Sequence, residues 1–169
     1  MFVSPEVPPK YELEELATQF PELNISAVET CLAFLKTTAL VYAALDAHLA
    51  RHQMSMGKFT VLMQLFRANG QRLTPSECAE RSGVTRGTIT GLLDGLERDG
   101  WVKRQPHPED RRRLVVQLTE QGQQNLTKML PDHFCRTTGL IAHLSLTEQK
   151  TLIQLLSKLQ AGVPAMRDF

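Results

Sequence analysis

Three consecutive arginines lie beside two carboxylates in the segment HPEDRRR, residues 107–113. A guanidinium donates hydrogen bonds in a planar fork that matches a phosphate, and it also enters the narrow minor groove of DNA, where the negative potential is deepest. Phosphate contacts add affinity without sequence information. We therefore expect Arg112 to enter the minor groove and Arg111 and Arg113 to contact phosphates, with Asp110 holding Arg112 in position.

The segments on either side of the arginines predict two strands. WVKRQP precedes the charged loop, and LVVQLT follows it with alternating residues, which is typical of a half-buried strand. The alternative is that the charged segment is an ordinary solvated surface loop. That alternative does not account for the strand pattern on each side of the segment. The pattern therefore predicts a β-hairpin whose basic tip projects as a wing.

Two short helices are predicted directly before this hairpin. Thr74, Pro75 and Glu77 form a capping box with proline at the first helical position, and this helix ends near Gly83. Thr85 caps the next helix, RGTITGLLDGLERDG. Two short helices joined by a tight turn predict a helix-turn-helix, and the hairpin makes the domain a winged helix.

The second helix of this pair has two different faces at 100° per residue. One face is apolar and predicts core residues, namely Ile89, Leu92, Leu93 and Leu96. The rest carries glycine at 87, 91 and 95, although each glycine costs roughly 1 kcal/mol relative to alanine in a helix. Close approach of a base edge explains such a bare stripe, and close packing of another helix is the alternative. The expected DNA contacts are Thr85, Arg86, Gly87, Thr88, Thr90 and Arg98.

Long apolar helices are predicted near both ends of the chain. In residues 24–53, apolar residues recur at three- and four-residue steps, namely Val28, Leu32, Leu35, Ala39, Tyr42, Leu45 and Leu49. A small domain does not usually bury such a long helix alone, so a partner surface is implied. A helix from Thr119 or Glu120 should be kinked or interrupted at Pro131, and a second capping box, Ser145 to Glu148, opens the last helix.

These elements predict a mainly α fold with a small β-hairpin wing. We expect an N-terminal arm with at most one short helix at 1–23, a dimerisation helix at 24–53, a winged helix-turn-helix domain at 54–118, and C-terminal dimerisation helices at 119–169. The content of 42% hydrophobic and 22% charged residues is that of a globular chain.

Charge is distributed unevenly along the chain. The net charge is only +1, but residues 1–50 carry −5 and residues 98–113 carry +3. A local field steers a polyanion more than total charge does. No apolar run approaches the roughly 18–20 residues that span a bilayer, and the N-terminus lacks a secretory pattern. We expect a cytoplasmic protein without a membrane segment or a cofactor.

The element order and two motifs resemble the MarR family of bacterial transcription regulators. DRRRLVVQLTEQG is similar to the family's wing motif, with the matching positions at Asp110, Arg112, Val116, Leu118 and Thr119, and LLDGLERDGWVKR at 92–104 is similar as well. The resemblance covers about residues 25–160. Many members carry an arginine where this chain has Gly91, so base readout here depends on Arg86, which can reach a guanine edge, on the threonines, or on DNA shape.

The resemblance implies a homodimer joined through the first and last helices, and a pseudo-palindromic operator in double-stranded DNA. We expect a repressor that a small aromatic effector releases. Family members bind such effectors between the dimer helices and the winged domain, a region that here holds Tyr42, Met56, Phe59, Met63 and Phe66. Plain core packing is the alternative for these residues.

Other functions remain as alternatives. Cys31 could sense oxidation as in the peroxide-responsive branch of the family, although its apolar neighbours indicate burial, and buried thiols are expected for all three cysteines. His48 and His52 have a spacing that suits one metal ion, but a helix C-terminus also favours a cation. A winged helix used only for protein contact is a further alternative. The sequence shows no nucleophile, phosphate-loop or nucleotide motif, so we expect no enzyme.

Overall fold

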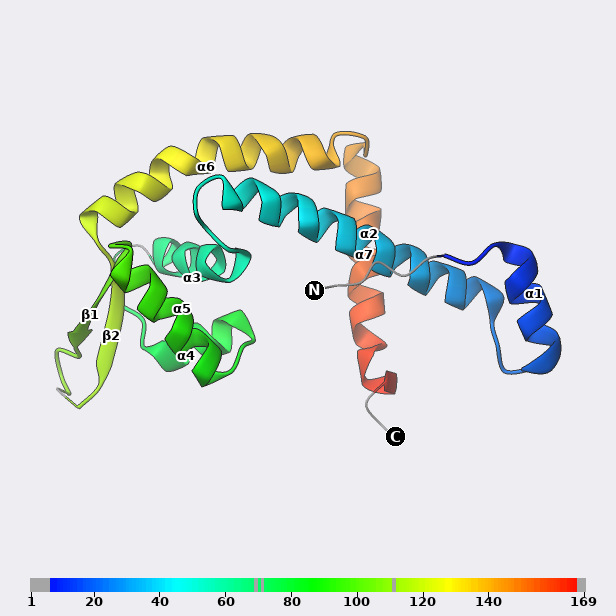
Figure 1. The fold of residues 1–169 in the computed structure, drawn as a ribbon, viewed down its shortest axis with the longest axis horizontal. Helices are drawn as coiled ribbons and strands as arrows, with labels where there is room; N and C mark the ends of the chain where they lie inside the picture. Colours follow the sequence, from blue (N-terminus) through cyan, green and yellow to red (C-terminus); the bar gives the residue numbers. More distant parts are fainter. Residues whose placement is uncertain (1–6, 69, 71, 111, 167–169) are drawn as a thin grey trace. The chain divides into compact units, whose positions relative to one another are not determined.

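The computed structural model describes residues 7–68, 70, 72–110 and 112–166. The described residues form helices and a two-stranded β-hairpin (Figure 1), which confirms the predicted mainly α fold with a hairpin wing. The elements in chain order are α1 (Lys10–Gln19), α2 (Ile25–Ala50), α3 (Met56–Arg67), α4 (Pro75–Ser82), α5 (Arg86–Arg98), β1 (Val102–Pro106), β2 (Leu114–Leu118), α6 (Glu120–Ile141), α7 (Leu146–Ala161) and the 3-10 helix η1 (Val163–Met166).

Most helices begin at a polar side chain that caps them. Asn24, Ser55 and Thr85 each accept a hydrogen bond from the backbone N–H three residues onward. The capping boxes of α4 and α7 are both complete, with the glutamate returning to the backbone N–H of the capping residue. Such caps satisfy N–H groups that have no partner within the helix. The predicted helix starts at Asn24, Thr74, Thr85 and Ser145 are therefore confirmed.

The winged-helix core is formed by α3, α4 and α5 against the hairpin (Figure 1). Strands β1 and β2 pair antiparallel, with Val102 opposite Leu118. Leu73 adds a bridge to β2 that the sequence pattern did not predict; its backbone exchanges hydrogen bonds of 3.1 and 2.7 Å with Val116. The fully buried side chains here include Leu62, Ile89, Leu93, Leu96, Val102, Val115 and Val116.

The chain divides into two compact units, one up to Gln123 and one from Gln124 onward. The predicted domain limits at 23/24, 53/54 and 118/119 stay predictions. Of the expected kink or interruption at Pro131, the interruption is absent, because α6 continues as one helix through this residue; the kink stays a prediction. A proline removes one backbone donor, and the remaining hydrogen bonds of a 22-residue helix continue on both sides.

The helices α2 and α7 expose much of their apolar surface. Among the residues of α2, which the structure describes throughout, only His48 and Leu49 are buried, and none of α7 is. By length and composition alone, α2 could cross a membrane, with a mean hydropathy of 1.4. The expectation that no segment is long and apolar enough to span a bilayer is therefore wrong. Alanines and threonines fill the positions between the larger apolar residues of Ile25–Ala50, so this helix has few charged residues.

Candidate nucleic-acid interface

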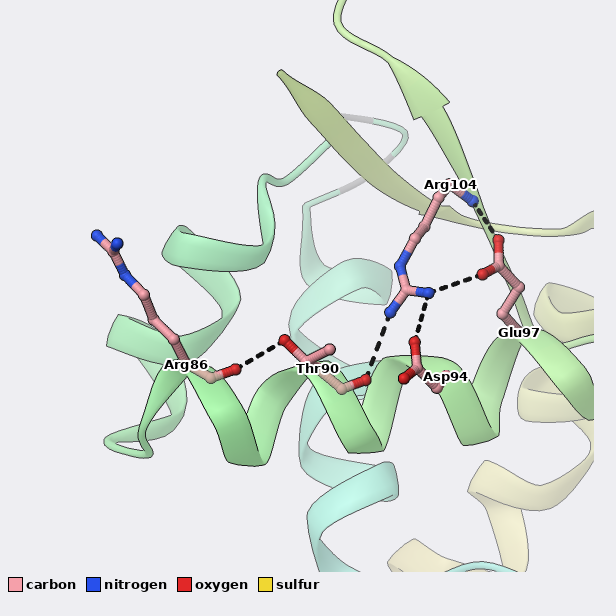
Figure 2. A network of polar contacts seen from close by, with 5 residues as sticks. All are labelled: Arg86, Thr90, Asp94, Glu97 and Arg104. Atoms are coloured by element: carbon pink, nitrogen blue, oxygen red, sulfur yellow. Dashed lines mark hydrogen bonds and ion pairs between the residues drawn. The ribbon is translucent and has the colours of Figure 1, made fainter. Parts of the chain in front are cut away.

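The N-terminal half of α5 presents an exposed row of small and polar residues. Thr85 accepts a hydrogen bond from the backbone N–H of Thr88, and their hydroxyls lie 2.9 Å apart. Thr90 donates its hydroxyl to the carbonyl of Arg86 at 2.8 Å. All of Thr85–Gly91 is exposed apart from Ile89, which is buried. The guanidinium of Arg86 extends away from the polar network farther along the helix (Figure 2).

The glycines of α5 divide into two kinds. A Cβ on Gly91 would meet no described atom within 4 Å, and one on Gly87 would meet only the Thr85 hydroxyl at 3.9 Å. Gly95 is buried, and its Cβ would lie 2.9 Å from Cε of Lys58. Close packing therefore explains why residue 95 is glycine, and the packing group is the side chain of Lys58 on α3 rather than the backbone of another helix. Gly87 and Gly91 instead face open space.

Lys58 crosses Gly95 to reach the C-terminal end of α5. Its Nζ lies 2.6 Å from Oδ2 of Asp99. The hydrogen bond from Lys58 is the main cause that lowers the pKa of the Asp99 carboxyl. Arg98, one of the expected DNA contacts, is exposed and lies 3.6 Å from the same carboxylate. The end of α5 is thus tied to α3 while Arg98 stays at the surface.

The wing loop is closed by its own backbone. His107 donates its N–H to the carbonyl of Arg113 at 2.8 Å, and the N–H of Arg113 reaches the carbonyl of Asp110 at 3.0 Å. The carboxylate of Asp110 accepts from the backbone N–H of Arg112 at 3.0 Å. Asp110 therefore contacts the backbone of Arg112, while the side chains of Arg112 and Arg113 are exposed. Arg111 lies outside the described residues.

Arg104 of β1 binds α5 and was missed as a site residue. Its Nη1 lies 2.6 Å from Oδ1 of Asp94 and 2.9 Å from Oε2 of Glu97. Its Nη2 donates to the carbonyl of Thr90 at 3.4 Å, and its backbone N–H donates to Glu97 at 2.9 Å. Figure 2 shows this guanidinium lying over α5. In the sequence Arg104 is one of several bases in residues 98–113, but its charge is balanced by two carboxylates.

The residues just after β2 form hydrogen bonds with the residues just before β1. Thr119 donates its backbone N–H to the carbonyl of Trp101 at 3.0 Å and its hydroxyl to the carbonyl of Gly100 at 2.7 Å. The same hydroxyl accepts from the N–H of Gly122 at 2.8 Å. A Cβ on Gly122 would clash with the carbonyl oxygen of Trp101. The Thr-x-x-Gly spacing was the signal that could have indicated this role.

The expected effector residues differ in burial. Tyr42 is exposed, Phe59 is buried, and Met56, Met63 and Phe66 are half-buried. Phe66 lines a cavity of about 410 Å³ in the winged-helix unit, whose other lining residues are Leu65, Arg67, Gly70, Gln117, Leu118 and Gln123.

The cysteines differ from the expected pattern. Cys31 and Cys135 are exposed, and only Cys78 is buried. Burial raises the pKa of the Cys78 thiol to about 11, which leaves it unreactive at neutral pH. The expected burial of Cys31 is wrong for the single chain, because nothing in the described chain covers its face of α2. The ring of His48, on α2, and the ring of His52, in the turn that follows α2, lie 5.5 Å apart and meet edge to face.

Comparison with known proteins identifies the family. The MarR family model matches residues 54–114. The chain is similar to the transcriptional repressor YetL of Bacillus subtilis, with 35% identity over 161 residues that cover 95% of this chain and 96% of that protein. It is also similar to the repressor MprA of Escherichia coli, with 34% identity over 64% of this chain and 61% of that protein.

Two solved structures bound to DNA have the same fold. Sco3205, a MarR family regulator from Streptomyces coelicolor, superposes with a TM-score of 0.77 at 24% identity, over 83% of this chain and 93% of that one. A mutant of MarR from Escherichia coli, complexed with operator DNA, gives a TM-score of 0.63 at 29% identity, over 70% and 84%. Together with the winged-helix geometry, the match along nearly all of YetL shows that the chain belongs to the MarR family of transcription regulators.

Proposed function

We propose that this regulator is a homodimeric repressor that places α5 in the major groove of an operator and the wing in the adjacent minor groove. The exposed face of the N-terminal half of α5 carries only small and polar residues apart from Arg86. The wing carries Arg112 and Arg113 on a loop that its own backbone hydrogen bonds close. Two adjacent cationic elements of this kind suit neighbouring grooves of one duplex.

The contacts on each element have separate roles. Arg86, Thr88 and Thr90 face base edges from the start of α5, and Thr85 and Gly87 lie close to the backbone of the DNA. Arg98, Arg111 and Arg113 bind phosphates. Arg112 enters the minor groove, and Asp110 presents it by holding its backbone N–H at 3.0 Å. A good bidentate contact to a base contributes about 1–3 kcal/mol of discrimination.

A second copy of the chain covers the apolar surface of α2 and α7. Leu40 is 59% exposed and Ile153 is 65% exposed in the single chain, which is costly for large apolar side chains in water. A two-fold dimer requires a pseudo-palindromic operator with half-sites about 34 Å apart. It also gives α2 a reason for its apolar composition without a membrane, and we place the regulator in the cytoplasm with its DNA.

A small aromatic effector is proposed to release the DNA. The cavity beside Phe66 combines apolar side chains with Arg67 and Gln117, a mixture that suits an amphipathic ligand. Tyr42, Met56, Phe59 and Met63 remain proposed contacts. Addition of an aromatic acid should weaken binding to a selected DNA fragment, and an effect on non-specific DNA alone would contradict release at the operator.

The observation that carries the proposal is the closed wing with Asp110 presenting Arg112. The test uses a DNA fragment that the wild-type protein enriches from its source genome. Arg112→Ala should weaken binding roughly 10- to 100-fold, since it removes a contact worth about 1–3 kcal/mol, while melting and dimer mass stay unchanged. Arg136→Ala is the matched control, because Arg136 pairs with Asp132 at 2.9 Å on α6.

Salt dependence separates this function from a protein-contact module. Wild-type binding should weaken steeply between about 50 and 200 mM salt, because cations that neutralise phosphates release counterions. Equal affinity of Arg112→Ala and wild type would remove the wing assignment. A wild-type protein that enriches no fragment and shows no salt dependence would contradict the DNA-binding function as a whole.

A further inference from the structure

The hairpin and α5 are joined by a charged contact away from the wing tip. Arg104 lies on β1, and both of its carboxylate partners, Asp94 and Glu97, lie on α5. Its guanidinium also donates to the carbonyl of Thr90, so one side chain spans two turns of the helix from Thr90 to Glu97. Figure 2 shows these contacts converging on a single guanidinium.

We propose that Arg104 is a positioning residue that fixes the angle between α5 and the wing, and so sets which base pairs the two elements read together. This inference rests on the proposed function, because it concerns the two elements that enter adjacent grooves. Arg104 itself touches no DNA in this proposal. Its guanidinium hydrogens point to α5, and its side chain is only 21% exposed.

The geometry makes this contact directional. A planar guanidinium that donates to Glu97 and to the Thr90 carbonyl and also pairs with Asp94 constrains the relative rotation of the two elements more than a single ion pair does. The backbone N–H of Arg104 adds a second link to Glu97 at 2.9 Å. Strand β1 therefore cannot slide along α5 without losing several charge-assisted hydrogen bonds.

The two carboxylates explain why Arg104 differs from the wing arginines. The two carboxylates balance the charge of the Arg104 guanidinium, so this group has no unpaired positive charge to offer a phosphate. Arg112, by contrast, uses its backbone N–H for Asp110 and leaves its guanidinium exposed. A basic segment of the sequence thus contains one arginine that orients the interface and others that face outward.

The main variant is Arg104→Gln, tested on the fragment that the wild-type protein enriches. We expect binding to weaken about tenfold, the equivalent of one lost base contact, with an unchanged slope of log affinity against log salt. A direct phosphate contact would instead lower the slope by about 0.9. Non-specific duplex should bind almost as before, because the phosphate contacts remain. Arg104→Lys should restore part of the affinity through one carboxylate.

A second variant gives an effect of opposite sign on the two kinds of DNA. Asp94→Asn combined with Glu97→Gln frees the guanidinium and removes two negative charges. Selected DNA should then bind more weakly and non-specific duplex more tightly. The carboxylates are 58% and 38% exposed, so water solvates whichever partner remains and the fold should persist, which melting and circular dichroism would verify.

The outcomes separate the two proposals. If the wild type enriches a fragment but Arg104→Gln binds it equally well, the positioning role is wrong and the proposed function stands. If Arg104→Gln lowers the slope of log affinity against log salt by about 0.9, the value for one phosphate contact, Arg104 contacts DNA directly and the positioning role is again wrong. Arg136→Ala, which also breaks an arginine–carboxylate pair, should change neither affinity nor slope.

Discussion

The winged-helix region and the long helices α2 and α7 contain similar apolar residues, but these residues are buried in the first and largely exposed in the second. In the winged-helix region, Leu62, Leu93 and Val116 are completely buried within one chain. On α2 and α7, Leu40 and Ile153 keep more than half of their surface in water. Hydrophobic burial stabilises by roughly 25 cal/mol for each Å² removed from water. One chain therefore completes the first region but leaves the second region incomplete.

The difference shows which part of the molecule folds on local information. The winged helix combines capped short helices, a tight turn and a hairpin, so its apolar faces meet within about 60 residues. The long helices have equally good caps at Asn24 and Ser145, but caps set where a helix begins and not what covers it. In the proposed dimer, the second copy supplies the surface that covers the long helices.

The largest expected effect comes from placing a charge in each region. Leu93→Asp should abolish folding of the winged helix, because burying an unpaired carboxylate costs several kcal/mol. Ile153→Asp should leave the helices folded but separate the dimer, since Ile153 is 65% exposed in one chain. Loss of the second copy removes avidity and should weaken operator binding by roughly 100-fold or more.

Sedimentation, circular dichroism and DNA binding distinguish these results. Gln154→Asp adds the same charge beside Ile153 at an exposed polar position and serves as the control, which should remain dimeric. A dimeric Ile153→Asp protein with full affinity would mean that the exposed face of α7 is not covered by a second copy.

A second expected effect concerns the junction after β2. Gly122→Ala should destabilise the winged-helix unit by about 1–3 kcal/mol, the usual cost of forcing atoms into a packed site, because the new Cβ would clash with the Trp101 carbonyl. Gly139→Ala is the matched control in the same helix, since no described atom lies within 4 Å of its Cβ position. It should stabilise α6 by up to about 1 kcal/mol. Equal melting temperatures of the two variants would contradict close packing of Gly122 against the Trp101 carbonyl.

The same contrast explains what the sequence could predict. The capping box of Thr74 and Glu77 was predictable because both partners lie within one helical turn. The role of Arg104 was not, because its partners are 7 and 10 residues away on another element and every nearby carboxylate was an equal candidate. The exposure of Cys31 was also unpredictable, since apolar neighbours indicate burial only when something in the same chain covers them.

A third prediction concerns pH and the start of α4. Hydrogen bonds from the backbone and hydroxyl of Thr74 lower the pKa of Glu77. A lowered pKa contributes stability above the ordinary glutamate pKa of about 4.3, and this contribution is lost as the pH falls through the lowered value. Glu77→Gln should therefore destabilise the protein at pH 7, and the difference from wild type should shrink as the pH falls below 4.

Glu80→Gln provides the control, because Glu80 lies on the same helix outside the capping box. Thr74→Ala should cost about 0.5–2 kcal/mol at neutral pH. Urea unfolding at several pH values measures both. A Glu77→Gln penalty that is constant from pH 7 to pH 3 would contradict the ionised capping box.

The smallest expected effect separates two glycines of α5. Gly91→Ala should stabilise the free protein by about 0.5–1 kcal/mol, because alanine favours the helix and the Cβ position is open among the described atoms. Gly95→Ala should gain less, because Lys58 must move from a position 2.9 Å away and loosen its contact with Asp99. If Gly91 is bare so that DNA can approach closely, Gly91→Ala should weaken operator binding despite the higher melting temperature. Unchanged operator affinity would assign Gly91 no part in recognition, and the close approach would then rest on Gly87 alone.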